Sequence, residues 1–184
     1  MPTAVALIVF GTLCRLVPHP PNFSPFGALS LYAGARLPRR WGWAVPLVAM
    51  ALSDMILEYG TGRSTFTPVR GTIYATYAAM ALLASWALRG RTSPWTLPAW
   101  SLAASSLFFL STNLAVWATG GMFPRTAAGL VACYVAALPF FGNTVVADLA
   151  GTAVLFGLGA LVRQRVPVVK REESGAGARP PRAG

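Results

Sequence analysis

Charged residues are scarce in this chain. Of its 184 residues, 11% are charged and only five are acidic, whereas 55% are hydrophobic. A soluble globular domain carries about 25% charged residues. This composition excludes an ordinary soluble domain and predicts an all-α, polytopic integral membrane protein. At this length we expect one folded domain, because the apolar runs follow one another with connections too short to hold a second.

Residues that ligate metals or form disulfides are also few. The chain has one histidine, His19, and two cysteines, Cys14 and Cys133, which both lie inside apolar segments. Buried cysteine usually acts as a small hydrophobe, and one histidine with two distant cysteines has no metal-ligand spacing. We therefore predict no disulfide framework, no metal site and no other cofactor. The chain has no Walker motif either, so any use of ATP would belong to a partner protein.

The net charge of +10 does not indicate a nucleic-acid-binding protein, because such proteins cluster Lys and Arg on a soluble surface. Here the basic residues lie between apolar runs and in the C-terminal segment. The first apolar run, PTAVALIVFGTL, has no basic residue before it and no small-x-small cleavage site after it. It does not fit a signal peptide, and we expect it to be retained as a helix.

Six apolar segments are candidates for membrane helices, since a helix needs about 20 apolar residues to cross about 30 Å of hydrocarbon. They lie at residues 2–18, 24–37, 41–58, 71–88, 95–118 and 126–163. The second is short and is expected to span incompletely or to pack against partners. Pro139 is expected to break the last segment. Either 126–138 crosses fully, or it forms a short interfacial or re-entrant helix before a sixth span at 142–163.

Positive charge favours six spans over seven. With the N-terminus inside, six spans place eleven basic residues inside and four outside, as the positive-inside rule requires. The four are Arg15, Arg63, Arg70 and Arg125. Seven spans would place the basic C-terminal segment outside. We therefore predict a transmembrane domain at 1–166, a disordered cytoplasmic tail at 167–184, and both termini on the cytoplasmic side of a bacterial inner membrane. Ser24 and Ser93, each before a proline, are predicted to cap helices.

Polar side chains inside spans are costly and usually mark a functional site or a pair. In the predicted topology, seven of them gather in the outer third of the membrane, while the inner two-thirds is almost entirely apolar. They are Arg15, Asp54, Glu58, Asn113, Trp117, Asn143 and Asp148. A channel or a proton relay needs polar groups along its full depth. The pattern instead predicts a cup that opens outward.

The stretch CRLVPHPPNFSPFGA, residues 14–28, is the predicted outer loop between the first two helices. Its prolines favour an extended conformation of low entropy, and a preorganised loop loses less entropy when a ligand binds. We expect His19 and Asn22 to lie over the cup. The predicted ligand-binding residues are Arg15, His19, Asn22, Phe23, Asn113, Trp117, Asn143 and Asp148, and no catalytic residue is assigned.

These residues also have structural interpretations. Arg15 would neutralise Asp54 or Asp148, and Trp117 would anchor at the membrane interface. Three functions stay open. A solute-binding subunit is favoured over a structural or assembly protein with a buried polar cluster. An intramembrane enzyme, with His19 as general base beside Asp148 or Asp54, is least favoured because no paired nucleophile or metal set accompanies the histidine.

The layout resembles the substrate-binding S component of energy-coupling factor vitamin transporters, which are six-helix bacterial membrane proteins. The resemblance spans about residues 5–162. NFSPFGALSLYAGARL is similar to the segment that opens the second helix there, and VACYVAALPFFGNTVVADLAG to the short outer helix, proline break and final helix. RLVPHPPNFSPFGA and FFLSTNLAVW also resemble a bacterial membrane family of unknown substrate with an RLxPHPPNFxPxGA signature.

This resemblance implies that the chain captures a small vitamin-like or polar solute from outside for uptake. It implies a transmembrane coupling subunit and two ATPase subunits as partners. The loop after the first helix and the outer ends of the fifth and sixth helices would contact the ligand. The first helix lacks the Ala-x-x-x-Ala patch that often serves coupling in those transporters.

Overall fold

The computed structural model describes residues 2–61 and 67–165. All regular structure in these residues is helical, which confirms the predicted all-α class. The helices are α1 (Pro2–Leu16), α2 (Phe26–Arg36), α3 (Arg39–Gly42), α4 (Ala44–Thr61), α5 (Pro68–Ala87), α6 (Thr96–Thr119) and α7 (Ala127–Arg165).

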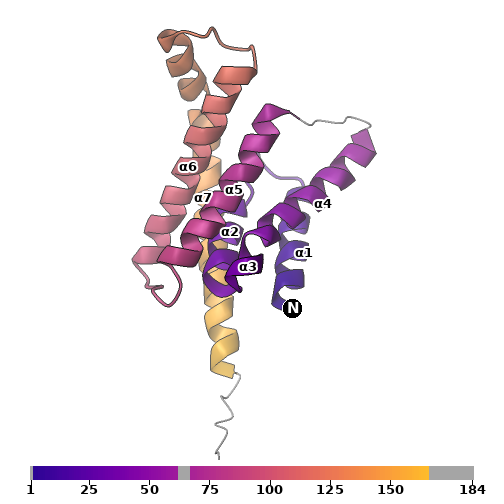
Figure 1. Ribbon diagram of the computed structural model, residues 1–184, viewed down its shortest axis with the longest axis vertical. Coiled ribbons are helices and arrows are strands. Elements are labelled where there is room, and N and C mark those ends of the chain that lie inside the picture. The colour runs from indigo at the N-terminus through magenta and orange to yellow at the C-terminus, as the bar shows by residue number, and fades with distance from the viewer. Residues whose placement is uncertain (1, 62–66, 166–184) are drawn as a thin grey trace, which may run out of the picture.

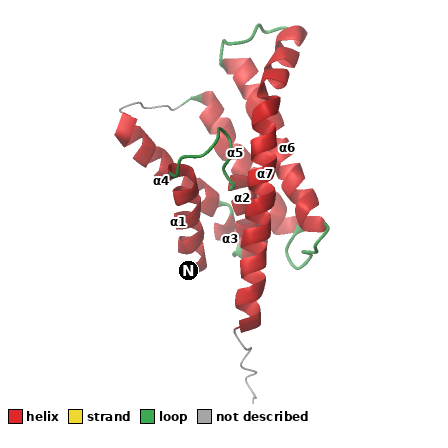
Figure 2. Cartoon of the chain, turned by 180° about the vertical axis from the view of Figure 1, so that it is seen from behind, coloured by secondary structure: helices red, strands yellow, loops and turns green. Residues whose placement is uncertain are grey.

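The start of α1 and the finish of α7 lie at the same end of the molecule (Figure 1). We call this the terminal end; the α2–α3 and α5–α6 connections lie there too. The opposite end, which we call the loop end, carries the α1–α2 connection at residues 17–25 and the α6–α7 connection at residues 120–126. Figure 2 shows the same arrangement from behind. The two ends differ in their polar residues, as described below.

Helix α2 is the centre of the fold. Every residue from Phe26 to Ala35 is buried, and α2 contacts α1 and each of the helices α3 to α7. Its sequence, FGALSLYAGAR, is rich in small residues, which let neighbouring helices approach closely. A Cβ at Gly34 would lie against the Ala81 carbonyl oxygen of α5. At about 1.5 Å per residue its 11 residues reach about 16 Å, too short to cross a membrane alone.

Three stretches in the described part of the chain are long and apolar enough to cross a membrane: Arg39–Tyr59, Thr96–Thr119 and Ala127–Arg163. Helix α1 is apolar but shorter. Large apolar side chains on these helices are exposed, among them Val135 at 58% and Leu158 at 56%. Such faces suit contact with lipid rather than water, which supports the predicted membrane protein.

Helix α7 corrects the prediction at Pro139. The chain does not break there into a short helix at 126–138 and a final helix; α7 is one helix of 39 residues with Pro139 inside it. A proline removes one helical hydrogen bond, and packing against a neighbouring helix can hold the helix together. Phe109 of α6 supplies that packing on both sides of the proline, with ring centroids 5.5 Å from Tyr134 and 4.7 Å from Phe141.

The two predicted serine caps have different outcomes. At the start of α6, Trp95 occupies the N-cap position without a side-chain cap, but the Ser93 hydroxyl accepts a hydrogen bond from the backbone N–H of Thr96, the first residue of the helix, at 3.1 Å. At the start of α2 the prediction is wrong: Pro25 occupies the N-cap position, and no side chain there accepts a hydrogen bond. A side chain from α7 takes that role instead.

Candidate functional site

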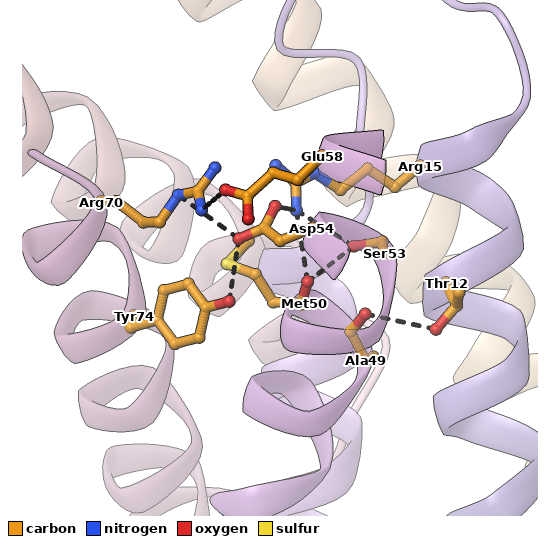
Figure 3. Close-up of polar contacts among 9 residues, drawn as sticks. All are labelled: Thr12, Arg15, Ala49, Met50, Ser53, Asp54, Glu58, Arg70 and Tyr74. Carbon is orange, nitrogen blue, oxygen red and sulfur yellow. Dashed lines mark hydrogen bonds and ion pairs between the residues drawn. The ribbon is translucent and has the colours of Figure 1, made fainter. Parts of the chain in front are cut away.

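A cluster of paired charges joins α1, α4 and α5 near the loop end (Figure 3). Its centre is Asp54 of α4, whose side chain is 6% exposed. Asp54 accepts hydrogen bonds from Arg15 and, at 2.8 Å, from the Tyr74 hydroxyl. Arg70 lies 3.5 Å from the other side of the same carboxylate and also pairs with Glu58, one helical turn along α4. We call these five residues the charge cluster.

The charge cluster is electrically balanced, since its two arginines face two carboxylates. Arg15 makes a further hydrogen bond to the Ser53 hydroxyl at 3.0 Å, and one turn earlier Thr12 donates to the Ala49 carbonyl at 3.2 Å. These contacts attach α1 to α4. The structural interpretation of Arg15 is therefore confirmed for Asp54, while Asp148 has a different partner.

Asp148 of α7 caps the N-terminus of α2. Its carboxylate accepts hydrogen bonds from the Ala28 backbone N–H at 3.0 Å and from the Ser105 hydroxyl of α6 at 2.8 Å. The side chain is 1% exposed, and no cation pairs with it among the described residues. The first N–H groups of a helix have no partner within the helix and favour a negative charge. Gly27 permits this approach, because a Cβ there would occupy the position of the carboxylate.

A small cavity lies beside the charge cluster at the loop end. Its volume is about 150 Å³. It is lined by Arg15, His19, Asn22, Ser24, Phe26, Met50, Ile73, Tyr77, Phe108 and Thr144. Three of these side chains form an aromatic stack, in which the Tyr77 ring lies 5.5 Å from Phe26 and 5.3 Å from Phe108 between centroids. The cavity thus combines an aromatic wall with a polar rim.

Helix α7 holds the loop that covers this cavity. The Asn143 side chain donates to the Pro21 carbonyl at 2.9 Å, and the Thr144 hydroxyl donates to the Asn22 carbonyl at 3.3 Å. Asn22 adopts a positive φ of 60°, a conformation that asparagine tolerates better than most residues. These bonds attach the loop to α7. The loop is not extended throughout as predicted, because it turns at Asn22, where the Phe23 N–H donates to the Pro20 carbonyl at 3.0 Å.

Three of the eight predicted ligand residues meet in the cavity: Arg15, His19 and Asn22. Asn143 lies next to them but uses its side chain to hold the loop. Asp148 does not line the cavity; its carboxylate accepts a hydrogen bond from α2 instead.

The other three predicted residues lie elsewhere. Phe23 faces a separate apolar groove between α1 and α7. Asn113 bonds the Phe109 carbonyl of its own helix at 2.8 Å, and the Trp117 indole donates to the Pro124 carbonyl at 3.0 Å. Both belong to the α6–α7 hairpin, which extends beyond the other helices (Figure 1). The structure thus does not bring Phe23, Asn113 and Trp117 to the cavity that Arg15, His19 and Asn22 line.

Sequence reasoning missed several polar groups at this site. Ser24 and Thr144 line the cavity, and Tyr74 and Ser105 bond the two buried aspartates. Ser24 lies in the proline-rich stretch between the first two helices, and Thr144 follows Asn143. Both are therefore next to residues that the sequence had already indicated as ligand-binding. Nothing in the local sequence marks Tyr74 or Ser105, because each is one of many hydroxyl residues on apolar helices.

The site does not assemble the dyad that the enzyme hypothesis requires. Nδ1 of His19 lies 2.9 Å from the Pro20 carbonyl oxygen. In the part of the chain that the structure describes, no hydrogen bond joins His19 to Asp54 or Asp148, whose oxygens are bonded to other groups. The same residues include no cluster of three His, Cys, Asp or Glu side chains that would suit a metal ion.

The chain matches a family of unknown function, DUF6580, over residues 1–169. It belongs to this family. A search of curated proteins and a search of solved structures found no match to the chain.

Proposed function

We propose that this DUF6580 protein is a membrane-embedded binding subunit that captures a small polar solute in the loop-end cavity. The observation that carries the proposal is an unpaired polar group in that cavity. The Ser24 hydroxyl is buried and has no hydrogen-bond partner among the described residues. A buried polar group without a hydrogen-bond partner lowers the stability of the fold by about 1–3 kcal/mol. A bound solute would supply the missing partner.

The size and charge of the cavity restrict the solute. Ligand pockets usually have volumes of about 300–1,000 Å³, whereas this cavity has about 150 Å³. A cavity of about that volume holds a molecule of the size of benzene. The nearest charges, Arg15 and Asp54, neutralise each other. We therefore narrow the expected vitamin-like ligand to a small, neutral or zwitterionic molecule with an apolar part that packs against the aromatic wall of the cavity.

We further propose six membrane helices, α1, α2 and α4 to α7, with α2 held inside the bundle. Both termini would face the cytoplasm of a bacterium, and the loop end would face outward. The arginines support this orientation, because most of the described ones lie at the terminal end and such residues favour the cytoplasmic side. They are Arg36, Arg39, Arg40, Arg89, Arg91, Arg163 and Arg165.

Uptake would follow capture, with a transmembrane coupling subunit and ATPase subunits as partners. This step rests on the resemblance to transporter S components. Phe26 at the start of the buried helix α2 and three residues of the loop before it line the cavity, so a movement of α2 relative to its neighbours would change the cavity.

A second candidate is a structural or assembly protein, and the charge cluster favours it. Asp54, Arg15 and Tyr74 already satisfy one another, and a balanced cluster can serve to fix helix positions alone. This candidate requires no ligand. The two proposals are distinguished by whether the cavity retains a molecule.

The test is mass spectrometry of small molecules released from the purified, detergent-solubilised protein. The cavity variant is the double substitution Ser24→Ala with His19→Ala. The matched control is Asn113→Ala, which also removes a polar side chain but lies in the α6–α7 hairpin. We expect a stoichiometric small compound in the wild type and the control, and its absence from the cavity variant.

Two outcomes contradict the binding proposal. If the compound is retained by the cavity variant, it binds elsewhere. If the wild type releases no compound and no candidate solute raises its melting temperature, as a ligand specific for the folded state must, the structural candidate takes precedence.

A further inference from the structure

Among the described residues, the arginines of the terminal end have no carboxylate that pairs with them. The acidic residues in the described part of the chain are Asp54, Glu58 and Asp148. The first two belong to the charge cluster near the loop end, and the third caps α2. No ion pair of the described residues involves an arginine of the terminal end. This end therefore has an excess of positive charge that its own helices do not neutralise.

Two of these arginines lie on one groove between α1 and α7. Its volume is about 590 Å³, and Arg36 of α2 and Arg163 of α7 both line it. The rest of its wall is mainly apolar and includes Leu7, Leu155 and Leu158. The groove thus has two arginine side chains on an otherwise apolar wall, although Arg36 also lines a neighbouring groove with Thr92 and Phe156. A surface that only faces lipid tails needs no such charges.

The contacts of Arg36 leave part of its guanidinium group available. One nitrogen donates to the Thr92 hydroxyl at 3.1 Å, and the group lies 5.5 Å from the centroid of the Phe156 ring. Its Nε is buried and has no hydrogen-bond partner among the described residues. Arg163 is close enough to repel it. An anion placed between them would offset this repulsion.

We propose that this groove binds an anionic phospholipid of the leaflet at the terminal end. The phosphate would lie between Arg36 and Arg163, and an acyl chain would lie along the apolar wall between α1 and α7. Basic pockets between membrane helices bind anionic headgroups, and the groove supplies both the charge for the headgroup and the surface for the chain. A free phosphate would use the arginines and leave the apolar wall without a partner.

The experiment is native mass spectrometry of the full-length protein in detergent micelles. Phosphatidylglycerol and phosphatidylcholine with identical acyl chains are titrated separately, and glycerol phosphate serves as the headgroup without chains. Arg163→Gln tests the headgroup contact, with Arg40→Gln as control, because Arg40 lies at the same end outside the groove. Ala6→Trp fills the groove from α1, with Val5→Trp as control, because Val5 is exposed and does not line it.

We expect one tightly bound phosphatidylglycerol and weaker binding of phosphatidylcholine. Arg163→Gln should weaken phosphatidylglycerol binding about fivefold, the usual contribution of one arginine at an anionic surface. Ala6→Trp should weaken binding of the lipid as well, and both controls should bind as the wild type does. Melting curves without added lipid verify that each variant is folded.

The proposal is overturned if the two lipids bind equally, or if Arg40→Gln weakens binding as much as Arg163→Gln. It is also overturned if Ala6→Trp has no effect, since the chain would then lie elsewhere. Binding of glycerol phosphate as tight as that of phosphatidylglycerol would show a phosphate site rather than a lipid site. None of these results depends on whether the loop-end cavity binds a solute.

Discussion

Replacing Asp148 tests the central feature of this fold, which is a buried helix capped by a side chain of another helix. In Asp148→Ala, the Ala28 N–H loses its acceptor in a region where Ala28 is 0% exposed. In Asp148→Asn, the side-chain carbonyl still accepts from Ala28, and the amide can donate to the Ser105 hydroxyl. The two substitutions therefore separate the hydrogen bonds from the charge.

The expected losses follow from the contacts. A hydrogen bond to a charged group contributes about 1.5–3 kcal/mol, and the interaction of a partly buried charge with a helix N-terminus contributes up to about 2 kcal/mol. Ser105 adds little, because its hydroxyl also lies 3.2 Å from the Ser101 carbonyl. Removing the buried charge offsets part of the loss. We expect unfolding free energies lower by about 3 kcal/mol for Asp148→Ala and about 1 kcal/mol for Asp148→Asn.

The assay is unfolding of the detergent-solubilised protein by SDS, followed by the fluorescence of its six tryptophans. The reasoning fails if Asp148→Ala lies within about 0.5 kcal/mol of the wild type, the usual range for substitutions that remove no interaction. It also fails if Asp148→Asn loses as much stability as Asp148→Ala. The hydrogen bonds that the asparagine side chain retains would then contribute nothing to stability.

The same assay tests three further predictions. Arg15→Ala should lower the unfolding free energy by about 2 kcal/mol, and a double-mutant cycle with Asp54→Asn should give a coupling energy of about 1–2 kcal/mol. A coupling energy near zero would show that the ion pair does not contribute to stability. Gly34→Ala should lower the unfolding free energy by at least about 2 kcal/mol, because the added methyl group overpacks the contact between α2 and α5. Gly71→Ala should be neutral or stabilising by up to about 1 kcal/mol, because Gly71 has open space around it. Equal effects of the two substitutions would contradict the close packing at Gly34. Ser101→Ala removes a buried hydroxyl without a partner among the described residues, so stability should not fall; a loss above about 1 kcal/mol would reveal a missed hydrogen bond.

The prediction of polar residues at one end of the helices succeeded where the residues pair locally. Asp54 and Glu58 are one turn apart on α4, so any helix would place them on one face. Because a buried carboxylate is stabilised by a cation or by hydrogen-bond donors, Arg15 is a candidate partner on sequence grounds alone. Asn113 and Trp117 do not line the cavity, because depth along a helix does not tell which way a side chain faces.

The sequence by itself determined that the chain is helical, apolar and contains one helix too short to span a membrane. These properties follow from composition and segment length, which act locally along the chain. Only the tertiary structure decided that α7 continues through Pro139 and that Asp148, 120 residues from Ala28, caps α2. Both depend on which helix packs against which, because a buried carboxylate or a proline in a helix is tolerated only where a neighbouring element supplies the missing contact.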